Sequence, residues 1–168
     1  ALVDEIIKYT ANIVAVEIQP NKAEKLMSTL SLYDGYETKR MICGDFLLMG
    51  DTIPKVDRVV MNPPFTPMEQ GYKILYAVME MSDIIIALMP WLTLINSEKR
   101  TSDIIGFGLK SISHLPRSAF AGARVQTCIL EMQKGFVGET SIRFPTKRAA
   151  DLLTGSAKLA CVAQVANR

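Results

Sequence analysis

The segment Asn62-Pro63-Pro64-Phe65 has the residue types that could hold and activate an amino group. Two consecutive prolines fix the backbone φ angle and remove two N–H donors, so their carbonyl groups remain as acceptors that a strand cannot easily recruit. The Asn62 side chain adds another carbonyl acceptor, and Phe65 adds a flat apolar face. The segment predicts a site that accepts two hydrogen bonds from an amine and stacks its ring. The simpler interpretation is a rigid turn after a strand.

Two acidic residues lie upstream of this segment, each at the end of an apolar run. Glu17 lies near the end of the run 12–18, and Asp45 directly follows the run 40–44. Short apolar runs of this kind indicate buried strands, and open parallel sheets bind ligands outside the carboxyl ends of their strands. A carboxylate at such a strand end can accept hydrogen bonds from two hydroxyl groups.

The elements that would position these residues alternate between strand and helix patterns. This alternation predicts an α/β domain with a mostly parallel sheet. The last two strands are separated by only about nine residues, too few for a parallel crossover, so this pair is predicted to be antiparallel. The expected strands are 12–18, 40–44, 56–61, 83–89, 111–115 and 125–132, and the expected helices start at Pro20, cover 71–81 and cover part of 97–109.

Composition excludes several classes of protein. The chain has 168 residues, of which 49% are hydrophobic and 21% charged, so it is predicted to fold as a domain with a real core. No apolar run has the roughly 18 residues that a membrane helix needs. The three cysteines are widely spaced and form no CxxC pair, which argues against a disulfide framework or a zinc ribbon and favours a reducing, cytoplasmic compartment. Cys43 and Cys128 are expected to be small core residues, and His114 to be structural.

Positive charge is concentrated in the second half of the chain. The formal net charge is +2, but residues 1–90 carry a net charge of −4 and residues 91–168 carry +6. A basic half is compatible with a polyanionic partner, and equally with an ordinary solvated surface.

The segment VVMNPPF resembles the catalytic motif of amino-group methyltransferases that use S-adenosylmethionine (AdoMet). The resemblance implies that the Asn62 side chain and the Pro63 carbonyl hold the target amine, that Pro64 completes the motif, and that Phe65 stacks on the flipped base. The same four residues occur in DNA adenine-N6 methyltransferases and in some ribosomal RNA guanine-N2 methyltransferases.

The resemblance also implies a binding site for AdoMet upstream of the motif. Glu17 lies where the family places the acid that binds the ribose hydroxyls, and Asp45 lies where it places a carboxylate that accepts from the adenine amino group. Ile18 and Phe46 follow these acids as apolar walls for the adenine. The spacing supports both assignments, because 28 residues separate the two acids and 17 more lead to the motif.

Downstream, the segment FAGARVQTCILEMQKG resembles a segment of the adenine methyltransferases of type I and related restriction-modification systems. The resemblance implies that Phe120 packs on the target base from its second side. It favours adenine in DNA as the substrate, and it makes a specificity or endonuclease subunit a possible partner. The implied fold is Rossmann-like and of class I, with a mostly parallel twisted sheet, helices on both faces and an antiparallel strand near the C-terminal end.

One departure from the family concerns the glycine-rich loop that cradles the methionine part of AdoMet. The sequence begins at residues that resemble those just after this loop, so we expect the central first strand and its loop to be absent from it. Residues 1–135 are assigned to the catalytic domain, and residues 136–168 stay unassigned. Two alternatives remain open: an RNA guanine-N2 methyltransferase, and an inactive module of this fold that binds nucleic acid or a partner subunit.

Overall fold

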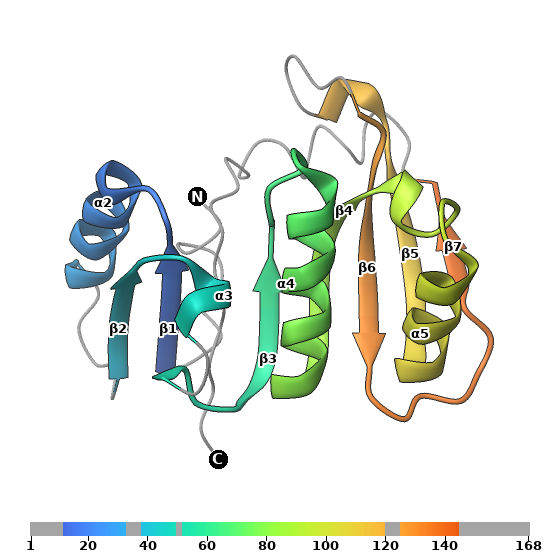
Figure 1. Cartoon of the computed structure of the whole chain (residues 1–168), viewed down its shortest axis with the longest axis horizontal. Coiled ribbons are helices and arrows are strands. Elements are labelled where there is room, and N and C mark those ends of the chain that lie inside the picture. The colour runs from blue at the N-terminus through green and yellow to red at the C-terminus, as the bar shows by residue number, and fades with distance from the viewer. Residues whose placement is uncertain (1–11, 33–37, 50–51, 120–124, 145–168) are drawn as a thin grey trace.

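Strands and helices alternate along the chain in the computed structural model, which describes residues 12–32, 38–49, 52–119 and 125–144 (Figure 1). Two short 3-10 helices, η3 and η4, follow β4 and β5. In order, the elements are β1 (Asn12–Glu17), α2 (Pro20–Ser31), β2 (Thr38–Cys43), α3 (Phe46–Met49), β3 (Val56–Met61), α4 (Met68–Met81), β4 (Ser82–Pro90), η3 (Trp91–Thr93), α5 (Glu98–Gly108), β5 (Leu109–Leu115), η4 (Arg117–Ala119), β6 (Thr127–Gln133) and β7 (Ser141–Arg143). The predicted α/β class is confirmed.

The described strands form two sheets. The smaller sheet pairs β1 with β2 in parallel, and the larger has the order β3-β4-β6-β5-β7. In the larger sheet, β3 pairs in parallel with β4 and β5 with β7, whereas β6 is antiparallel to both of its neighbours. The antiparallel arrangement of β5 and β6 is therefore confirmed. Among the described strands, β1 and β3 are not paired by hydrogen bonds, so the two sheets are separate.

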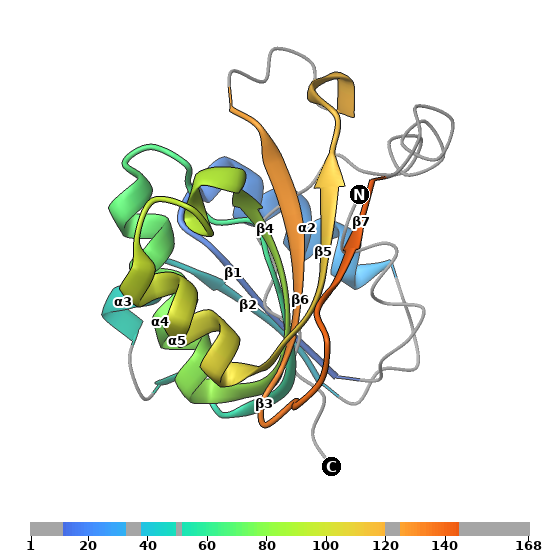
Figure 2. The ribbon, with the colours of Figure 1, turned by 90° about the vertical axis from the view of Figure 1, so that its right-hand side faces the viewer.

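A single hydrophobic core joins the two sheets. Val14 and Val16 of β1 belong to the same buried cluster as Val59 and Met61 of β3. All six residues of β1 are buried, as expected for a strand that is covered on both faces. Helices α3, α4 and α5 lie together on one side of the strands (Figure 2), and α2 packs on β1 and β2 at the opposite end of the molecule from β7 (Figure 1).

The turn from α5 into β5 needs a glycine. Gly108 has a φ of 128°, a conformation that side chains with a Cβ rarely adopt. A Cβ at Gly108 would also overlap the carbonyl oxygen of Gln133 at the end of β6. The close approach lets β5 begin directly after the helix and pair with β6.

Three expectations about local structure differ from what the structure shows. Cys43 is expected in the core, but it is exposed at the end of β2, which pairs only with β1 among the described strands. Cys128, in contrast, is fully buried. The helix expected over 71–81 begins three residues earlier, at Met68, directly after Pro67. β7 is not predicted by the sequence, because three exposed residues with a single apolar side chain are too short a pattern to indicate a strand.

Candidate active site

The NPPF segment (residues 62–65) leaves the larger sheet directly after β3. The ladder between β3 and β4 ends with the pair Met61 and Ala87, and the prolines that follow have no N–H to extend it. Pro63 is buried and Pro64 is exposed. Asn62 and Phe65 are both half-buried. Pro63 therefore anchors the segment in the protein, while the Asn62 and Phe65 side chains remain partly exposed to solvent.

Helix α4 packs directly on this segment through a glycine. Gly71 is buried, and a Cβ at this position would stand 2.8 Å from the Pro64 carbonyl oxygen and 3.7 Å from Cγ of Pro63. The contact with α4 thus limits where the backbone of Pro63 and Pro64 can lie relative to β3. The motif search gives no role to Gly71, although an isolated glycine inside a helical pattern often has a packing reason.

The two predicted acids lie at the carboxyl ends of the two neighbouring strands of the smaller sheet. Glu17 is the last residue of β1 and is only 6% exposed, and its Oε1 accepts a hydrogen bond of 2.9 Å from the backbone N–H of Gln19. Asp45 lies two residues after β2, and its Oδ1 accepts a 2.9 Å bond from the backbone N–H of Leu47. The N–H of Gly44 donates to the Glu17 carbonyl over 3.0 Å, so the two loops are tied together.

The apolar neighbours of the acids have different environments. Ile18 is 54% exposed, whereas Phe46 is half-buried and packs against the core at the start of α3. Each carboxylate has about four lone-pair positions, of which the bonds above use one. The acids and their neighbours thus retain the acceptors and apolar surface that an adenosine would need, and the residues present fit this part of AdoMet.

The acids and the NPPF segment share one edge of the molecule. β1, β2 and β3 point the same way in Figure 1, so their carboxyl ends lie along the same edge. This placement was expected for ligand-binding residues of an open parallel sheet. Phe120, the predicted second aromatic of the site, lies outside the described residues.

The end of β4 lies beside the NPPF segment and carries a further group of contacts. The backbone N–H of Trp91 donates to the Gln126 carbonyl over 2.8 Å, which connects η3 to the segment that leads into β6. The indole of Trp91 meets the His114 ring edge to face, with centroids 5.3 Å apart. Nε2 of His114 lies 2.6 Å from Nε2 of Gln126, and the Phe144 ring lies 5.4 Å from the imidazole. These contacts give His114 a structural place in the fold.

The structure provides neither a membrane span nor a metal centre in the ranges it describes. No helix there is long and apolar enough to cross a membrane. Within the same ranges, no group of three His, Cys, Asp or Glu side chains is arranged to hold a metal ion.

Several solved structures with a similar fold are methyltransferases. One is the M protein of the type I restriction enzyme EcoKI, with a TM-score of 0.65 and 21% sequence identity over 74% of this chain and 31% of that protein. A proposed RNA methyltransferase from Pyrococcus horikoshii aligns with a TM-score of 0.53 and 21% identity over 76% of this chain and 65% of the other. A proposed class I S-adenosylmethionine-dependent methyltransferase from Listeria monocytogenes aligns with a TM-score of 0.53 and 14% identity over 92% and 66%.

The chain therefore has the α/β fold of the class I methyltransferases, with a mixed larger sheet in which β6 is antiparallel to both neighbours. It spans between 31% and 66% of the length of these three proteins. No protein family and no curated protein matches the sequence itself.

Proposed function

We propose that the protein transfers a methyl group from AdoMet to the exocyclic N6 amine of adenine in DNA. One observation carries the proposal: a segment that can hold an amine and two carboxylates that can hold an adenosine lie at the same edge of a methyltransferase fold. The similarity to the M protein of a DNA restriction enzyme supports DNA as the substrate.

The NPPF segment would activate the amine. An exocyclic aromatic amine is a poor nucleophile because its lone pair is delocalised into the ring. The Asn62 side-chain oxygen and the Pro63 carbonyl would each accept a hydrogen bond from one N–H group of the amine. These two bonds would favour tetrahedral geometry at the nitrogen and stabilise the positive charge that develops there. The backbone of Pro63 suits this task because it is buried and carries no competing N–H donor.

Glu17 and Asp45 would position the methyl donor. The carboxylate of Glu17 would accept from the ribose hydroxyls, and that of Asp45 from the adenine amine, between Ile18 and Phe46. When bound, AdoMet would supply a methyl group on a positively charged sulfur, so that the nitrogen lone pair of the amine can form a bond to the methyl carbon as the carbon–sulfur bond breaks and the neutral thioether leaves. The nitrogen then loses a proton to solvent, and the protein mainly sets the alignment of the two groups.

The target base has to leave the DNA duplex to reach this edge. Extrusion of a base has a free-energy cost of a few kcal/mol. Stacking on Phe65 would offset part of that cost, and Phe120 would pack on the other side of the base. Phe65 is half-buried, so part of its side chain is accessible for such a contact.

Two other functions remain alternatives. The similarity to a proposed RNA methyltransferase favours RNA as the alternative substrate, and the resemblance of the NPPF motif implies guanine N2 as the acceptor there. A module of this fold without catalytic activity, which binds nucleic acid or a partner such as a specificity or endonuclease subunit, is the second alternative. Its distinguishing property would be nucleic-acid binding without methyl transfer.

A methylation assay distinguishes these functions. The protein is incubated with labelled AdoMet and either DNA or RNA, and the methylated base is identified at nucleotide resolution. We expect Asn62→Ala to lower the rate of methyl transfer by about 10²–10³, because a preorganised polar contact of this kind acts mainly on the transition state. Phe65→Ala should also weaken binding of the flipped base by roughly 1–3 kcal/mol, and Phe65→Trp should keep part of the activity. A parental rate in Asn62→Ala would mean that the segment is only a rigid turn.

A further inference from the structure

Arg100, in the first turn of α5, is held in one orientation by two contacts. Its guanidinium carbon lies 3.8 Å from the centroid of the Tyr72 ring of α4. Its Nε donates a hydrogen bond of 2.9 Å to the carbonyl oxygen of Thr93, at the end of η3. A guanidinium stacked on an aromatic face and bound through Nε keeps its two terminal nitrogens free to act as a planar fork of donors.

The loop that carries Thr93 is itself firmly attached to α5. The Ser97 hydroxyl accepts from the backbone N–H of Arg100 over 3.3 Å and caps the helix. The Thr101 hydroxyl donates to the carbonyl oxygens of Leu94, over 2.6 Å, and of Ser97, over 2.9 Å. The guanidinium is therefore fixed by a rigid support as well as by its own contacts.

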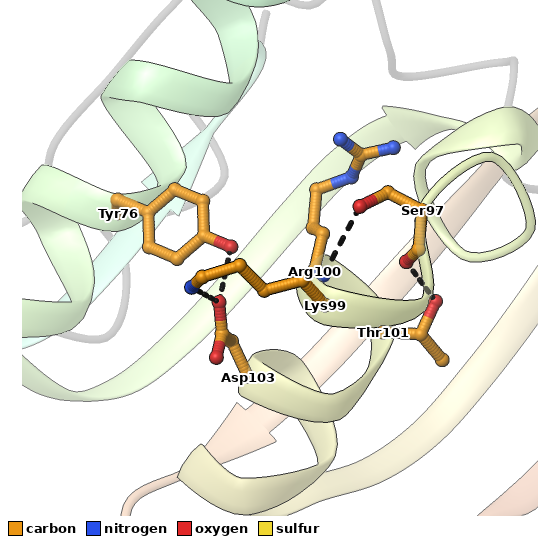
Figure 3. Close-up of polar contacts among 6 residues, drawn as sticks. All are labelled: Tyr76, Ser97, Lys99, Arg100, Thr101 and Asp103. Carbon is orange, nitrogen blue, oxygen red and sulfur yellow. Dashed lines mark hydrogen bonds and ion pairs between the residues drawn. The ribbon is translucent and has the colours of Figure 1, made fainter.

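The neighbouring cation, Lys99, is in a different situation. Its Nζ lies 2.7 Å from Oδ2 of Asp103, which also accepts a 2.6 Å bond from the Tyr76 hydroxyl (Figure 3). The bonds from Lys99 and Tyr76 lower the pKa of the Asp103 carboxyl, so the carboxylate stays charged and compensates the ammonium. Arg100 forms no ion pair with any carboxylate among the described residues. Figure 3 shows its terminal nitrogens pointing away from the other side chains drawn.

Arg100 is connected to the NPPF segment through elements that contact both. Tyr72, which supports the guanidinium, directly follows Gly71, the residue that packs on the Pro64 carbonyl. Thr93 lies three residues beyond the end of β4, the parallel neighbour of β3. The unpaired guanidinium and the segment that would hold the base therefore share one edge of the protein.

We propose that Arg100 binds a phosphate of the DNA backbone next to the flipped nucleotide and so sets the position of the strand at the active site. This inference rests on the proposed function. A planar guanidinium matches the geometry of phosphate oxygens through two parallel N–H···O bonds. Because stacking and the Nε bond already fix the fork, little side-chain entropy would be lost on binding. The half-buried position would strengthen the interaction relative to that of a fully solvated lysine.

The test measures the affinity of the protein for an adenine-containing DNA duplex over a range of salt concentrations. Each phosphate that a cation neutralises contributes about −0.9 to the slope of log K against log salt concentration. Arg100→Gln should therefore reduce the magnitude of the slope by about 0.9 and weaken binding about 10-fold or more at low salt. The loss should be the same for every duplex sequence, because phosphates carry no sequence information. AdoMet affinity should not change.

Lys99→Gln is the matched control. It also removes one positive charge, at the position next to Arg100, but Asp103 already compensates the charge of Lys99. We expect its slope and its affinity for DNA to stay at the parental values. An equal loss in both variants would overturn the proposal, because it would show a general effect of surface charge. Arg100→Lys keeps the charge and removes the fork, so it should keep the slope but bind several-fold more weakly. Arg100→Lys also tests the proposal if Arg100→Gln fails to fold. A parental affinity of Arg100→Lys for DNA would overturn the proposal.

The outcomes also separate this inference from the function on which it rests. If the parental protein binds no DNA and methylates none, the proposed function fails. If it binds and methylates DNA while Arg100→Gln keeps the parental slope, the function stands and the assignment of Arg100 is wrong.

Discussion

Gly71 of α4 touches the Pro64 carbonyl so closely that a Cβ at this glycine would stand 2.8 Å from the oxygen, a separation that real Cβ atoms essentially never show. The neighbour is backbone rather than a flexible side chain, so an added methyl group would have to move the helix or the proline segment. The position of the Pro64 carbonyl, and with it that of the preceding Pro63 carbonyl proposed to accept from the amine, therefore depends on a residue that has no functional group.

Gly71→Ala should separate stability from activity. Alanine favours a helix over glycine by about 1 kcal/mol, which offsets part of the strain. A shift of a few tenths of an ångström in the proline backbone should lower the methyl-transfer rate on the order of 10-fold, since about 1 Å of misplacement can cost 10²-fold. The measurement is kcat together with KM for DNA and the affinity for AdoMet. Only kcat should change substantially.

Gly106→Ala is the control for this substitution. Gly106 is an exposed glycine of α5, and no atom lies within 4 Å of a Cβ placed there. The same change should raise the melting temperature slightly and leave kcat unchanged. Equal kinetics in the two variants would show that the contact with Pro64 does not position the NPPF segment.

Glu17→Ala should weaken AdoMet binding by about 1–3 kcal/mol, through the loss of charge-assisted hydrogen bonds to the ribose. Glu17→Gln keeps an acceptor and should lose less. Titration calorimetry measures both affinities, and the melting temperature without AdoMet detects any separate loss of the bond to the Gln19 N–H. An AdoMet affinity that stays at the parental value in Glu17→Ala would remove Glu17 from the binding site.

Thr93→Val should stabilise the fold. Thr93 is fully buried, and its Oγ1 has no hydrogen-bond partner among the described residues. Such a hydroxyl has a desolvation cost of about 1–3 kcal/mol, and valine has nearly the same shape. The melting temperature should rise by roughly 2–4 °C for each kcal/mol recovered. Thr101→Val provides the contrast, because the Thr101 hydroxyl makes two hydrogen bonds and its loss should lower the melting temperature. A lower melting temperature in Thr93→Val would point to a partner for the hydroxyl.

The cysteines should differ in their reaction with an alkylating reagent. Burial raises the pKa of the Cys128 thiol to about 12, so this thiol stays protonated and unreactive at every pH well below that value. Cys43 is exposed. At about pH 8, peptide mass spectrometry should find Cys43 modified in the folded protein and Cys128 modified only after denaturation. Rapid modification of native Cys128 would mean that the β4–β6 core opens readily.

The sequence was sufficient to predict those features that depend on local pattern. Apolar runs placed the strands, and the short connection between β5 and β6 predicted their antiparallel pairing. The strand ends then placed Glu17, Asp45 and Asn62 at one edge, and the structure has them there. Their chemical roles stay predictions.

Features that depend on tertiary contacts could not be predicted in this way. No sequence spacing predicts that Gly71 packs on Pro64 or that Arg100 stacks on Tyr72. Each contact joins two separate elements, and only the fold defines their relative position. Cys43 was misplaced for a similar reason: an apolar residue type does not reveal that a strand ends at that position.

The boundary between the two sheets also affects how the proposed reaction could be tuned. The acids that would hold the methyl donor lie at the end of β1 and just after β2, whereas the NPPF segment follows β3. No hydrogen-bonded pairing of β1 with β3 imposes the strand spacing of about 4.8 Å. The relative placement of donor and acceptor is then sensitive to the volumes of core side chains such as Val16 and Val59, which belong to the same cluster. A change in the volume of a core side chain there would alter the distance between the methyl donor and its acceptor, although no such side chain is proposed to contact the target base.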